Sequence, residues 1–296
     1  MLKKLNKIAK DTNHYLLKYL QEQNNSELIV PMKYGLLPGG KKIRSKVLVD
    51  VGRIFRINYK TLIQIGAAVE CIHAYSLIHD DLPCMDDDDL RRGKLSTHKK
   101  FGEATAVLAG NSLLTLAFEI LSNNNLKLNS DIKIKLINLI SEFSGHSGIA
   151  GGQFLDLNFE RKKIPLEKIL KMQLKKTAKL FIFCCVSPVL ISKKKNQINN
   201  FKKIGSDIGL LFQIVDDLID FKGSAKVAGK KTKKDQKKGK ATLINLIGYD
   251  NTFIYAKNIQ NRIFKKLKKF GKKSKDLKET INFIFERNKW KKNIYI

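Results

Sequence analysis

The sequence predicts an all-α protein, and three observations lead to this fold class. The chain of 296 residues contains only five prolines. Its apolar residues recur at intervals of three and four over long windows, and we find no convincing run in which apolar and polar residues alternate. With 43% hydrophobic residues, the chain has enough apolar side chains for a large core, and we expect a single domain over residues 1–296.

The helical pattern runs through nine segments in order along the chain. Two polar connections stand out between them: residues 82–100, with Pro83 and four consecutive aspartates, and residues 222–240, rich in lysine and glycine. The first segment has a basic start but no continuous apolar stretch, so we expect an amphipathic helix and not a signal peptide. We expect helices over residues 3–23, 41–56, 60–81, 103–123, 131–149, 166–190, 197–221, 252–270 and 275–288.

The chain is strongly basic, with 57 Lys and Arg residues against 27 Asp and Glu residues and a formal net charge of +30. Such a charge attracts nucleic acid, a membrane surface or a phosphorylated substrate. Only eight of the basic residues are arginines, and the chain is rich in Ile and Asn, so we attribute part of the charge to coding bias. Four cysteines without a CxxC pair, and a longest apolar stretch of about twelve residues where a membrane span needs roughly twenty, favour a cytoplasmic protein with no membrane span.

Two of the expected helices end in paired aspartates. Residues 66–78 and most of 204–215 are apolar on nearly every helical face, so both helices should lie centrally in a bundle. A carboxylate at the end of a buried helix costs several kcal/mol unless a cation compensates its charge. Two such clusters in one chain therefore indicate bound cations.

The spacing of these aspartates favours Mg²⁺. Asp216 and Asp220 are four residues apart and project from one helix face, with Asp217 turned by about 100° from Asp216. All-oxygen carboxylate sites suit hard divalent ions, and Mg²⁺ prefers one or two carboxylates together with waters and substrate phosphates.

The other cluster opens with the same pair, Asp80 and Asp81, but has a longer gap that contains Pro83. The proline should end or distort the helix, which lets Asp86 fold back beside Asp80.

Basic residues lie where an anionic ligand would need them. Residues 39–44 form a glycine turn that opens a helix, and such a helix start can hold a phosphate. Arg91 and Arg92 offer planar guanidinium groups suited to phosphate oxygens. Lys230 and Lys240 lie in the second polar connection. Taken singly, each of these basic residues is more often a solvated surface group. Carboxylates flanked by cations nevertheless favour metal-bridged diphosphate over nucleic acid, whose phosphates the aspartates would repel.

A series of motifs resembles the trans-isoprenyl diphosphate synthases, most closely their bacterial farnesyl-type branch. The match covers residues 35–245 in the family's order, and ERNK at 286–289 is similar to the family's C-terminal end. The family commonly has proline after the first motif, where this chain has Ser45. The motifs are GGKKIR at 39–44, ECIHAYSLIHDDLPCMDDDDLRRG at 70–93, THKKFGEATAVLAGNSLL at 97–114, GGQFLDL at 151–157, KT at 176–177, GLLFQIVDDLIDF at 209–221 and the GK, D and GK series at 229–240.

The resemblance implies a polyprenyl synthetase-type domain: an isoprenoid-synthase-type helical bundle around a central cavity, forming a homodimer. It implies a Mg²⁺-dependent prenyltransferase that condenses isopentenyl diphosphate head-to-tail (1′-4) with an allylic diphosphate through an allylic carbocation. Three Mg²⁺ ions would hold the allylic diphosphate. The implied metal ligands are Asp80, Asp81, Asp86, Asp216, Asp217 and Asp220.

The resemblance also implies roles for other residues. Arg91, Lys176 and Lys230 would bind the allylic diphosphate, and Lys240 would support the closed loop. Lys41, Arg44, His73 and Arg92 would hold isopentenyl diphosphate. Thr177, Gln213 and Phe212 are candidates to stabilise the carbocation.

We expect product length to depend on Tyr75, which lies five residues before Asp80 and so deeper in the cavity. A ring there would form the floor of a pocket for a fifteen-carbon product, although Tyr75 is equally compatible with an ordinary core aromatic. Ten-carbon and twenty-carbon products remain alternatives. A different class of protein, a non-catalytic basic helical protein that binds RNA or a membrane, would place its lysines in one stripe, whereas they are spread along this chain.

Overall fold

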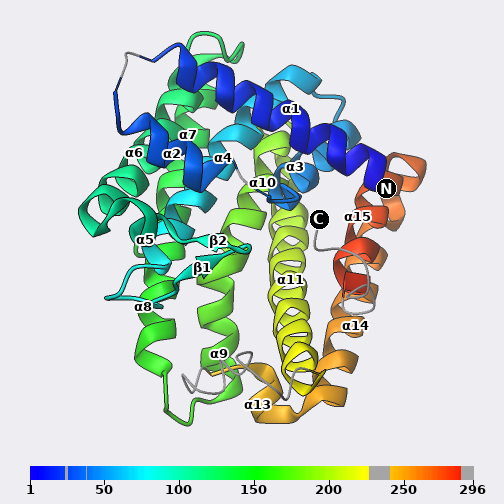
Figure 1. Cartoon of the computed structure of the whole chain (residues 1–296). Helices are drawn as coiled ribbons and strands as arrows, with labels where there is room; N and C mark the ends of the chain where they lie inside the picture. Colours follow the sequence, from blue (N-terminus) through cyan, green and yellow to red (C-terminus); the bar gives the residue numbers. More distant parts are fainter. Residues whose placement is uncertain (24–25, 38, 227–240, 288–296) are drawn as a thin grey trace. The chain divides into compact units, whose positions relative to one another are not determined.

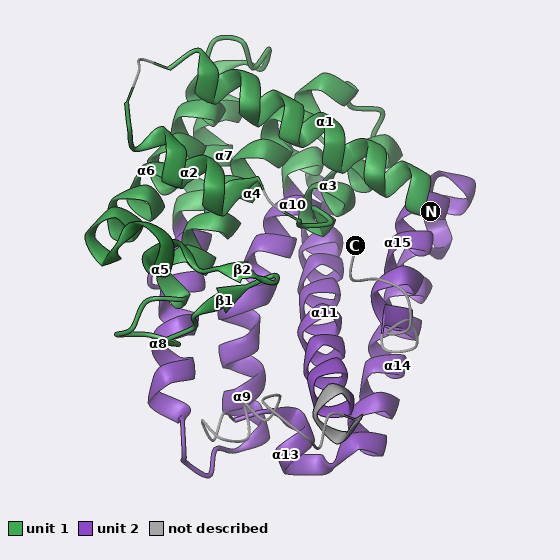
Figure 2. Ribbon diagram, viewed as in Figure 1, with its two compact units in different colours: residues 1–141, 187–195 green, residues 142–186, 196–296 purple. Residues whose placement is uncertain are grey.

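The structure is a computed structural model, which describes residues 1–23, 26–37, 39–226 and 241–287 (Figure 1). These residues are almost entirely helical, which confirms the all-α prediction. The chain divides into two compact units, residues 1–141 with 187–195 and residues 142–186 with 196–296 (Figure 2). The single domain over residues 1–296 stays a prediction.

In the first unit, α4 (Tyr59–Asp80) forms the centre of the core. The side chain of Asn58 caps its start by accepting hydrogen bonds from the amides of Lys60 and Thr61. Every residue from Thr61 to Ile72 is buried. The helix packs against four others, and this confirms the predicted central position of residues 66–78. Its neighbours are α1 (Leu2–Gln21), α2 (Ile29–Leu36), α3 (Ile43–Ile54) and α6 (Glu103–Ser122).

The polar connection after α4 contains a short hairpin that the sequence pattern did not predict. Strands β1 (Leu90–Arg91) and β2 (Lys94–Leu95) pair antiparallel, and α5 (Thr97–Phe101) follows. Arg92 and Gly93 between them both have positive φ angles, 54° and 76°, which is the two-residue turn that matches the twist of paired strands. Two-residue strands are too short to show an alternating pattern.

In the second unit, the long helix α11 (Ile198–Lys226) packs against elements from both sides of it in the sequence. Gly205 and Gly209 allow this packing, because a Cβ atom at Gly209 would lie 2.3 Å from the Cα atom of Ala178. The other elements are the end of α7 (Ser130–Ser144), α8 (Ile149–Phe159), α9 (Leu166–Gln173), a π-helical turn η1 (Leu174–Ala178), α10 (Lys179–Ile191) up to Val186, the end of η2 (Lys195–Gln197), α13 (Leu243–Ile247), α14 (Tyr249–Leu267), η3 (Lys268–Ser274) and α15 (Lys275–Glu286).

Two of the predicted helices were wrong in extent. The helix expected over 166–190 is interrupted by the π-turn η1, whose wider turn does not alter the apolar pattern enough to be recognised. The helix expected over 131–149 ends at Ser144, because a side chain at Gly148 would lie 1.9 Å from the carbonyl oxygen of Phe143 and only glycine fits this tight turn. The short helices α2, α5, α8 and α13 were not predicted.

Two helices are long and apolar enough to cross a membrane by length and composition alone, α4 and α6. In α4, 83% of the apolar window is buried, as expected for a core helix, whereas 44% is buried in α6. The core helix of a folded domain passes the same test. The absence of a membrane span therefore stays a prediction.

Candidate active site

The first aspartate cluster is built by the backbone that follows α4. The helix ends at Asp80, and the chain reverses after Pro83 so that the amide of Asp86 donates to the carbonyl oxygen of Asp80 at 2.8 Å. The amide of Met85 donates to the carbonyl oxygen of Leu82 at 2.9 Å and closes the same turn. The predicted return of Asp86 beside Asp80 is confirmed.

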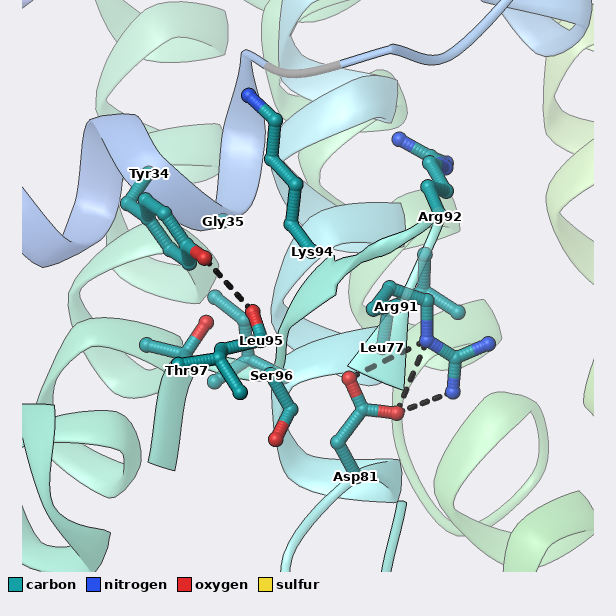
Figure 3. Close-up of a pocket in the computed structure, with 11 residues that line it drawn as sticks. Tyr34, Gly35, Leu77, Asp81, Arg91, Arg92, Lys94, Leu95, Ser96 and Thr97 are labelled. Atoms are coloured by element: carbon teal, nitrogen blue, oxygen red, sulfur yellow. Dashed lines mark hydrogen bonds and ion pairs between the residues drawn. The ribbon is translucent and has the colours of Figure 1, made fainter. Parts of the chain in front are cut away.

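The second aspartate of this cluster is held by an arginine from the hairpin. The Arg91 Nε atom donates to both Asp81 carboxylate oxygens, at 2.9 and 3.2 Å, and Nη2 pairs with Oδ1 (Figure 3). Burial raises the pKa of Asp81 above its ordinary value, although the hydrogen bond and charge of Arg91 oppose this effect. Burial alone would lower the pKa of Arg91, but the hydrogen bond from Arg91 to Asp81 and the charge of Asp81 raise it overall. The carboxylate is engaged by nitrogen donors, and its role as a metal ligand stays a prediction.

The hairpin that carries Arg91 is fixed to α2. The Tyr34 hydroxyl donates to the carbonyl oxygen of Leu95 at 2.8 Å, and Figure 3 shows this bond on one side of a pocket that also contacts Asp81 and Arg91. The Arg92 side chain points away from Asp81 in this view. Arg91 and Arg92 therefore lie in different surroundings although they are consecutive in the chain.

A group of cations converges on His73, on the half-buried face of α4. Burial lowers the pKa of His73 well below its ordinary value, and the charges of Arg44, Arg92, Lys42 and Arg91 lower it further. The imidazole is therefore neutral near pH 7 and can donate one hydrogen bond to an anion among these cations. This arrangement brings the predicted residues Arg44, His73 and Arg92 together.

The glycine turn before α3 allows an arginine to approach the backbone. Gly39 has a φ of 65°, a conformation that glycine adopts without strain. A Cβ atom at Gly40 would lie 2.8 Å from Nη1 of Arg92, so the guanidinium group occupies the space that a side chain would fill. The turn and the hairpin are thus in contact.

Lys42 in the same turn is buried, and its side chain points into the protein interior. Its Nζ atom donates to the carbonyl oxygen of Leu36 at 2.8 Å and lies 3.8 Å from Glu70. Burial lowers the pKa of Lys42, while the charge of Glu70 opposes the effect. Lys41 and Arg44, the two predicted members of this motif, flank it in the chain.

In the second unit, α11 carries the other aspartate cluster. Asp216 is partly exposed and lies 3.0 Å from Nη1 of Arg287, while Asp220, one turn later, is exposed. Asp217 is buried and accepts hydrogen bonds from the amide groups of Gln213 at 2.9 Å and Gln173 at 3.2 Å. As in the first cluster, the second aspartate of the pair is engaged by nitrogen donors.

The π-turn places two predicted residues next to this cluster. Thr177 donates to the Gln213 side-chain oxygen at 2.7 Å, and Lys176 lies 2.6 Å from Asp156. A Cβ atom at Gly152 would lie 2.2 Å from the amide nitrogen of Lys176, so this glycine allows α8 to approach the π-turn. The side chains of Asp156, Lys176, Thr177 and Gln213 line one pocket.

One aromatic ring precedes each aspartate pair. Phe212 lies beneath the Arg287 guanidinium group, whose central carbon is 4.1 Å from the ring centroid. Tyr75 is buried on α4 and packs edge-on against His79, with ring centroids 5.6 Å apart. Burial, and then the charge of Asp80, raise the pKa of Tyr75 to about 12, so the ring is neutral at physiological pH.

Comparisons with known proteins identify the family. A family model described as polyprenyl synthetase matches residues 25–284, which is most of the chain. The chain belongs to the polyprenyl synthetase family.

Relatives within the polyprenyl synthetase family are similar over almost their whole length. A farnesyl diphosphate synthase of Escherichia coli is 40% identical over 271 residues, 90% of this chain and 91% of the relative. The crystal structure of an FPP/GFPP synthase from Zymomonas mobilis has a TM-score of 0.86 at 35% identity, covering 96% of this chain and 98% of that one. A geranyltransferase from Helicobacter pylori, solved with magnesium and isoprenyl diphosphate, has a TM-score of 0.80 at 30% identity, covering 96% of each.

The residues of this family member fit a hard divalent cation. Asp80 and Asp86 are held together by the backbone bond between them, and Asp216 and Asp220 are one helical turn apart. Carboxylate oxygens in such groups are ligands that Mg²⁺ prefers. The donor chemistry of both clusters therefore suits the magnesium on which this family depends.

A further acidic group lies beyond the first cluster. Ligand atoms of Asp87, Asp89 and His98 lie within 4.8 Å of one another. The ammonium group of Lys99 lies 3.0 Å from Asp89 and supplies a positive charge there. The ion pair between Lys99 and Asp89 therefore balances part of the negative charge of this group without a metal ion.

Sequence reasoning missed four residues that the structure places in these surroundings. Asp156 lies within the quoted motif at 151–157 and Arg287 within ERNK, so both motifs carried a signal. Glu70 opens the quoted motif at 70–93, but its contact with Ser45 depends on packing, and Gln173 lies outside every quoted motif. The predicted residues Lys230 and Lys240, and Asp235 between them, lie outside the described residues.

Proposed function

We propose that this prenyltransferase makes farnesyl diphosphate. It joins isopentenyl diphosphate head-to-tail to dimethylallyl diphosphate and then to the resulting geranyl diphosphate. The observation that carries the proposal is the pairing, within one unit, of a folded-back aspartate loop with a separate group of cations around His73. Such a pair suits two diphosphates, one bound through metal ions and one bound by side chains alone. The 40% identity to the Escherichia coli enzyme supports the same reaction.

The proposed metal ligands are the outer aspartates of both clusters. Asp80 and Asp86 in the first, and Asp216 and Asp220 in the second, would hold three Mg²⁺ ions, with Asp81 and Asp217 completing the set. When bound, Mg²⁺ neutralises the allylic diphosphate and stabilises the negative charge that develops on it as the C–O bond breaks.

Two side chains complement the departing diphosphate. Arg91 is held by Asp81 and Lys176 by Asp156, so both cations are oriented before the substrate binds. Fixed charges of this kind stabilise a transition state without reorganising. Lys230 and Lys240 are proposed to assist them.

The allylic cation that remains needs electron-rich neighbours that do not react with it. Thr177 and Gln213 present dipoles from a hydrogen-bonded chain, and the Phe212 ring already binds the guanidinium group of Arg287 on its face. An aromatic face attracts a cation by about 0.5–2 kcal/mol, depending on desolvation. These groups would hold the cation while water is excluded.

The second substrate, isopentenyl diphosphate, is assigned to Lys41, Arg44, Arg92 and His73. Its double bond attacks the allylic cation, and the proton lost from the adduct passes to the departed diphosphate. The neutral His73 imidazole would donate a hydrogen bond to its diphosphate among the surrounding cations.

Product length is assigned to Tyr75. The buried, neutral ring one and a half turns before Asp80 would block growth beyond fifteen carbons. Geranyl and geranylgeranyl diphosphate are the alternative products. The similar Zymomonas mobilis protein is an FPP/GFPP synthase, which favours a longer alternative over a shorter one.

We also propose that the enzyme is a cytoplasmic homodimer without a membrane span and without a nucleic-acid partner. The resemblance of the motifs to the family supports this assembly. Light scattering of the purified protein measures the mass directly, and a monomer of 33.7 kDa at micromolar concentration would contradict it.

A product-length assay tests the function. Purified protein, Mg²⁺, labelled isopentenyl diphosphate and dimethylallyl or geranyl diphosphate should give a fifteen-carbon product, which Asp80→Ala and Asp216→Ala abolish. Asp131→Ala, on α7 and outside both clusters, is the matched control and should retain activity. A ten- or twenty-carbon product would change the proposed product, and the absence of any elongation would overturn the enzyme proposal.

A further inference from the structure

The first turn of α3 has a capping problem that its own residues do not solve. The helix begins at Ile43, and its first internal bond runs from the amide of Lys46 to the carbonyl oxygen of Lys42 at 3.0 Å. The amide of Ser45, the third helical residue, is therefore one of the donors that lack an acceptor within the helix. The residue at the capping position is Lys42, whose side chain donates to Leu36 and makes no cap hydrogen bond.

Glu70 on α4 supplies the missing acceptor. Its Oε1 atom accepts hydrogen bonds from the Ser45 amide at 3.2 Å and from the Ser45 hydroxyl at 3.0 Å. Glu70 is 3% exposed, and Lys42 lies 3.8 Å away and partly balances its charge. A carboxylate at a helix N-terminus is also favoured by the helix dipole. The cap of α3 is thus provided by a neighbouring helix.

The contact seats the turn tightly on α4. The Ser45 hydroxyl also lies 3.2 Å from the carbonyl oxygen of Gly66, and a Cβ atom at Gly66 would lie 3.0 Å from that hydroxyl. Because Arg44 directly precedes Ser45, a shift of Ser45 would move the backbone of Arg44 and of the glycine turn before it.

Ser45 brings two hydrogen-bond donors to this contact. Glu70 binds both its amide and its hydroxyl. A proline at this position would have no amide hydrogen and would leave no donor that needs a cap.

We propose that the contact between Ser45 and Glu70 is a positioning device for the second-substrate site, which fixes the first turn of α3 on α4 and thereby holds Lys41 and Arg44 in place. The inference rests on the proposed function, which assigns these two cations to isopentenyl diphosphate. Glu70 acts through Ser45 and is a positioning residue.

A double-mutant cycle tests the device. Glu70→Leu removes both acceptor oxygens and should raise the KM for isopentenyl diphosphate about tenfold, the order expected for losing a hydrogen bond to a charged group. The KM for the allylic substrate and kcat should change less than twofold. Glu70→Gln keeps one acceptor oxygen and should recover most of the loss.

The second arm of the cycle uses proline. In a Ser45→Pro background no amide hydrogen needs a cap, so Glu70→Leu should raise the KM for isopentenyl diphosphate by less than threefold. The inference would be overturned if Glu70→Leu had the same effect in the wild-type and Ser45→Pro backgrounds. It would also be overturned if the KM values for isopentenyl diphosphate and for the allylic substrate rose equally.

A matched control separates positioning from general destabilisation. Val47 is fully buried two residues further along α3, and Val47→Ala opens a cavity while both residues of the Ser45–Glu70 contact stay unchanged. It should lower the thermal midpoint and leave the ratio of the two KM values unchanged. A changed ratio would show that any weakening of α3 has the same effect, which contradicts a specific anchor.

Hydrogen exchange gives a readout that does not need activity. Amides of residues 39–46 in the substrate-free protein should exchange faster in Glu70→Leu than in the wild type, and this difference should vanish in the Ser45→Pro background. A wild-type protein without elongation activity would overturn the proposed function, while this non-additive exchange would still support the anchor. Additive exchange would overturn the anchor even in an active enzyme.

Discussion

In the first unit, a pair of aspartates ends α4, and a third carboxylate returns to them through a loop. In the second unit, the corresponding three aspartates lie on the continuous helix α11. The loop needs backbone hydrogen bonds to bring Asp86 to Asp80, whereas the helical period alone places Asp216 and Asp220 on one face. The same set of carboxylates is therefore assembled by two different backbones.

The two clusters agree in one respect that the motifs do not state. The second aspartate of each pair is buried and held by nitrogen donors, with Arg91 on Asp81 and two glutamine amides on Asp217. Each of these two carboxylates fixes the orientation of the side chains that donate hydrogen bonds to it. We therefore expect the outer aspartates of each cluster to contribute most to metal binding, and the middle one, although part of the proposed ligand set, to contribute mainly to positioning.

The outer aspartates give the largest expected effect. Asp80→Ala and Asp216→Ala should each lower kcat on the order of 10²–10³-fold, because each removes charge stabilisation of the transition state. Thermal midpoints should change little, because neither carboxylate lies in an apolar core. Steady-state kinetics and thermal unfolding check both statements, and a variant with ordinary kcat would remove that residue from the metal site.

The middle aspartates should behave differently. Asp81→Ala removes the hydrogen bonds of Arg91 and leaves it only its longer ion pair with Asp88, at 3.5 Å. Asp217→Ala removes the acceptor of two glutamine amide groups, so each variant should lower the free energy of unfolding by about 1–3 kcal/mol. Urea unfolding measures the change, with Asp131→Ala as the control. If these variants keep wild-type stability and lose as much kcat as the outer ones, the proposed division of work is wrong.

The aromatic rings before the two pairs sharpen the same comparison. Tyr75→Ala should lengthen the main product, since it removes the proposed floor, and chromatography of the products reports the change. Phe212→Leu should lower kcat a few-fold, within the roughly 0.5–2 kcal/mol of a cation over an aromatic face, and leave the product length unchanged. An unchanged fifteen-carbon output from Tyr75→Ala would remove Tyr75 from the floor.

Pro83 allows the difference between the two backbones to be reduced. In Pro83→Ala the helix can continue past Asp81, which draws Asp86 away from Asp80 and makes the first cluster more like the second. We expect kcat to fall about tenfold, less than for removal of a ligand, because all three carboxylates of the first cluster are still present. The Mg²⁺ concentration that gives half of the maximal rate should rise. An unchanged concentration would show that the loop does not need the proline.

The smallest expected effect concerns His73 and pH. Its pKa in the folded protein is well below 6.5, so the unfolded chain binds its proton at higher pH than the folded chain does. The resulting stability is present above about pH 6.5 and is lost as the pH falls, by at most about 1.4 kcal/mol per pH unit. Urea unfolding between pH 8 and 5 should show a shallower decline for His73→Gln than for the wild type; parallel curves would contradict this.

Much of the fold and of the candidate site could be predicted from the sequence, because both follow from local rules. Helical periodicity located α4 and α11, and the proline between Asp81 and Asp86 indicated the return of the chain. The contacts of Gln173, 44 residues before Asp217, could not be predicted, since they depend on how α9 packs against α11. The cap from Glu70 to Ser45 depends in the same way on the packing of α3 against α4.

The π-turn η1 has a consequence for how loss of function in this protein should be diagnosed. A π-turn is equivalent to one residue inserted into an α-helix. Deleting one residue between Leu174 and Ala178 would produce a regular helix from α9 into α10, and the far-ultraviolet circular dichroism spectrum would hardly change. The deletion would also rotate α9 by about 100° relative to α10, which moves Gln173 away from Asp217. The deletion variant would thus have a normal spectrum and yet lack the contact between Gln173 and Asp217. Its structure would differ from the wild type in the rotation of α9 about its axis.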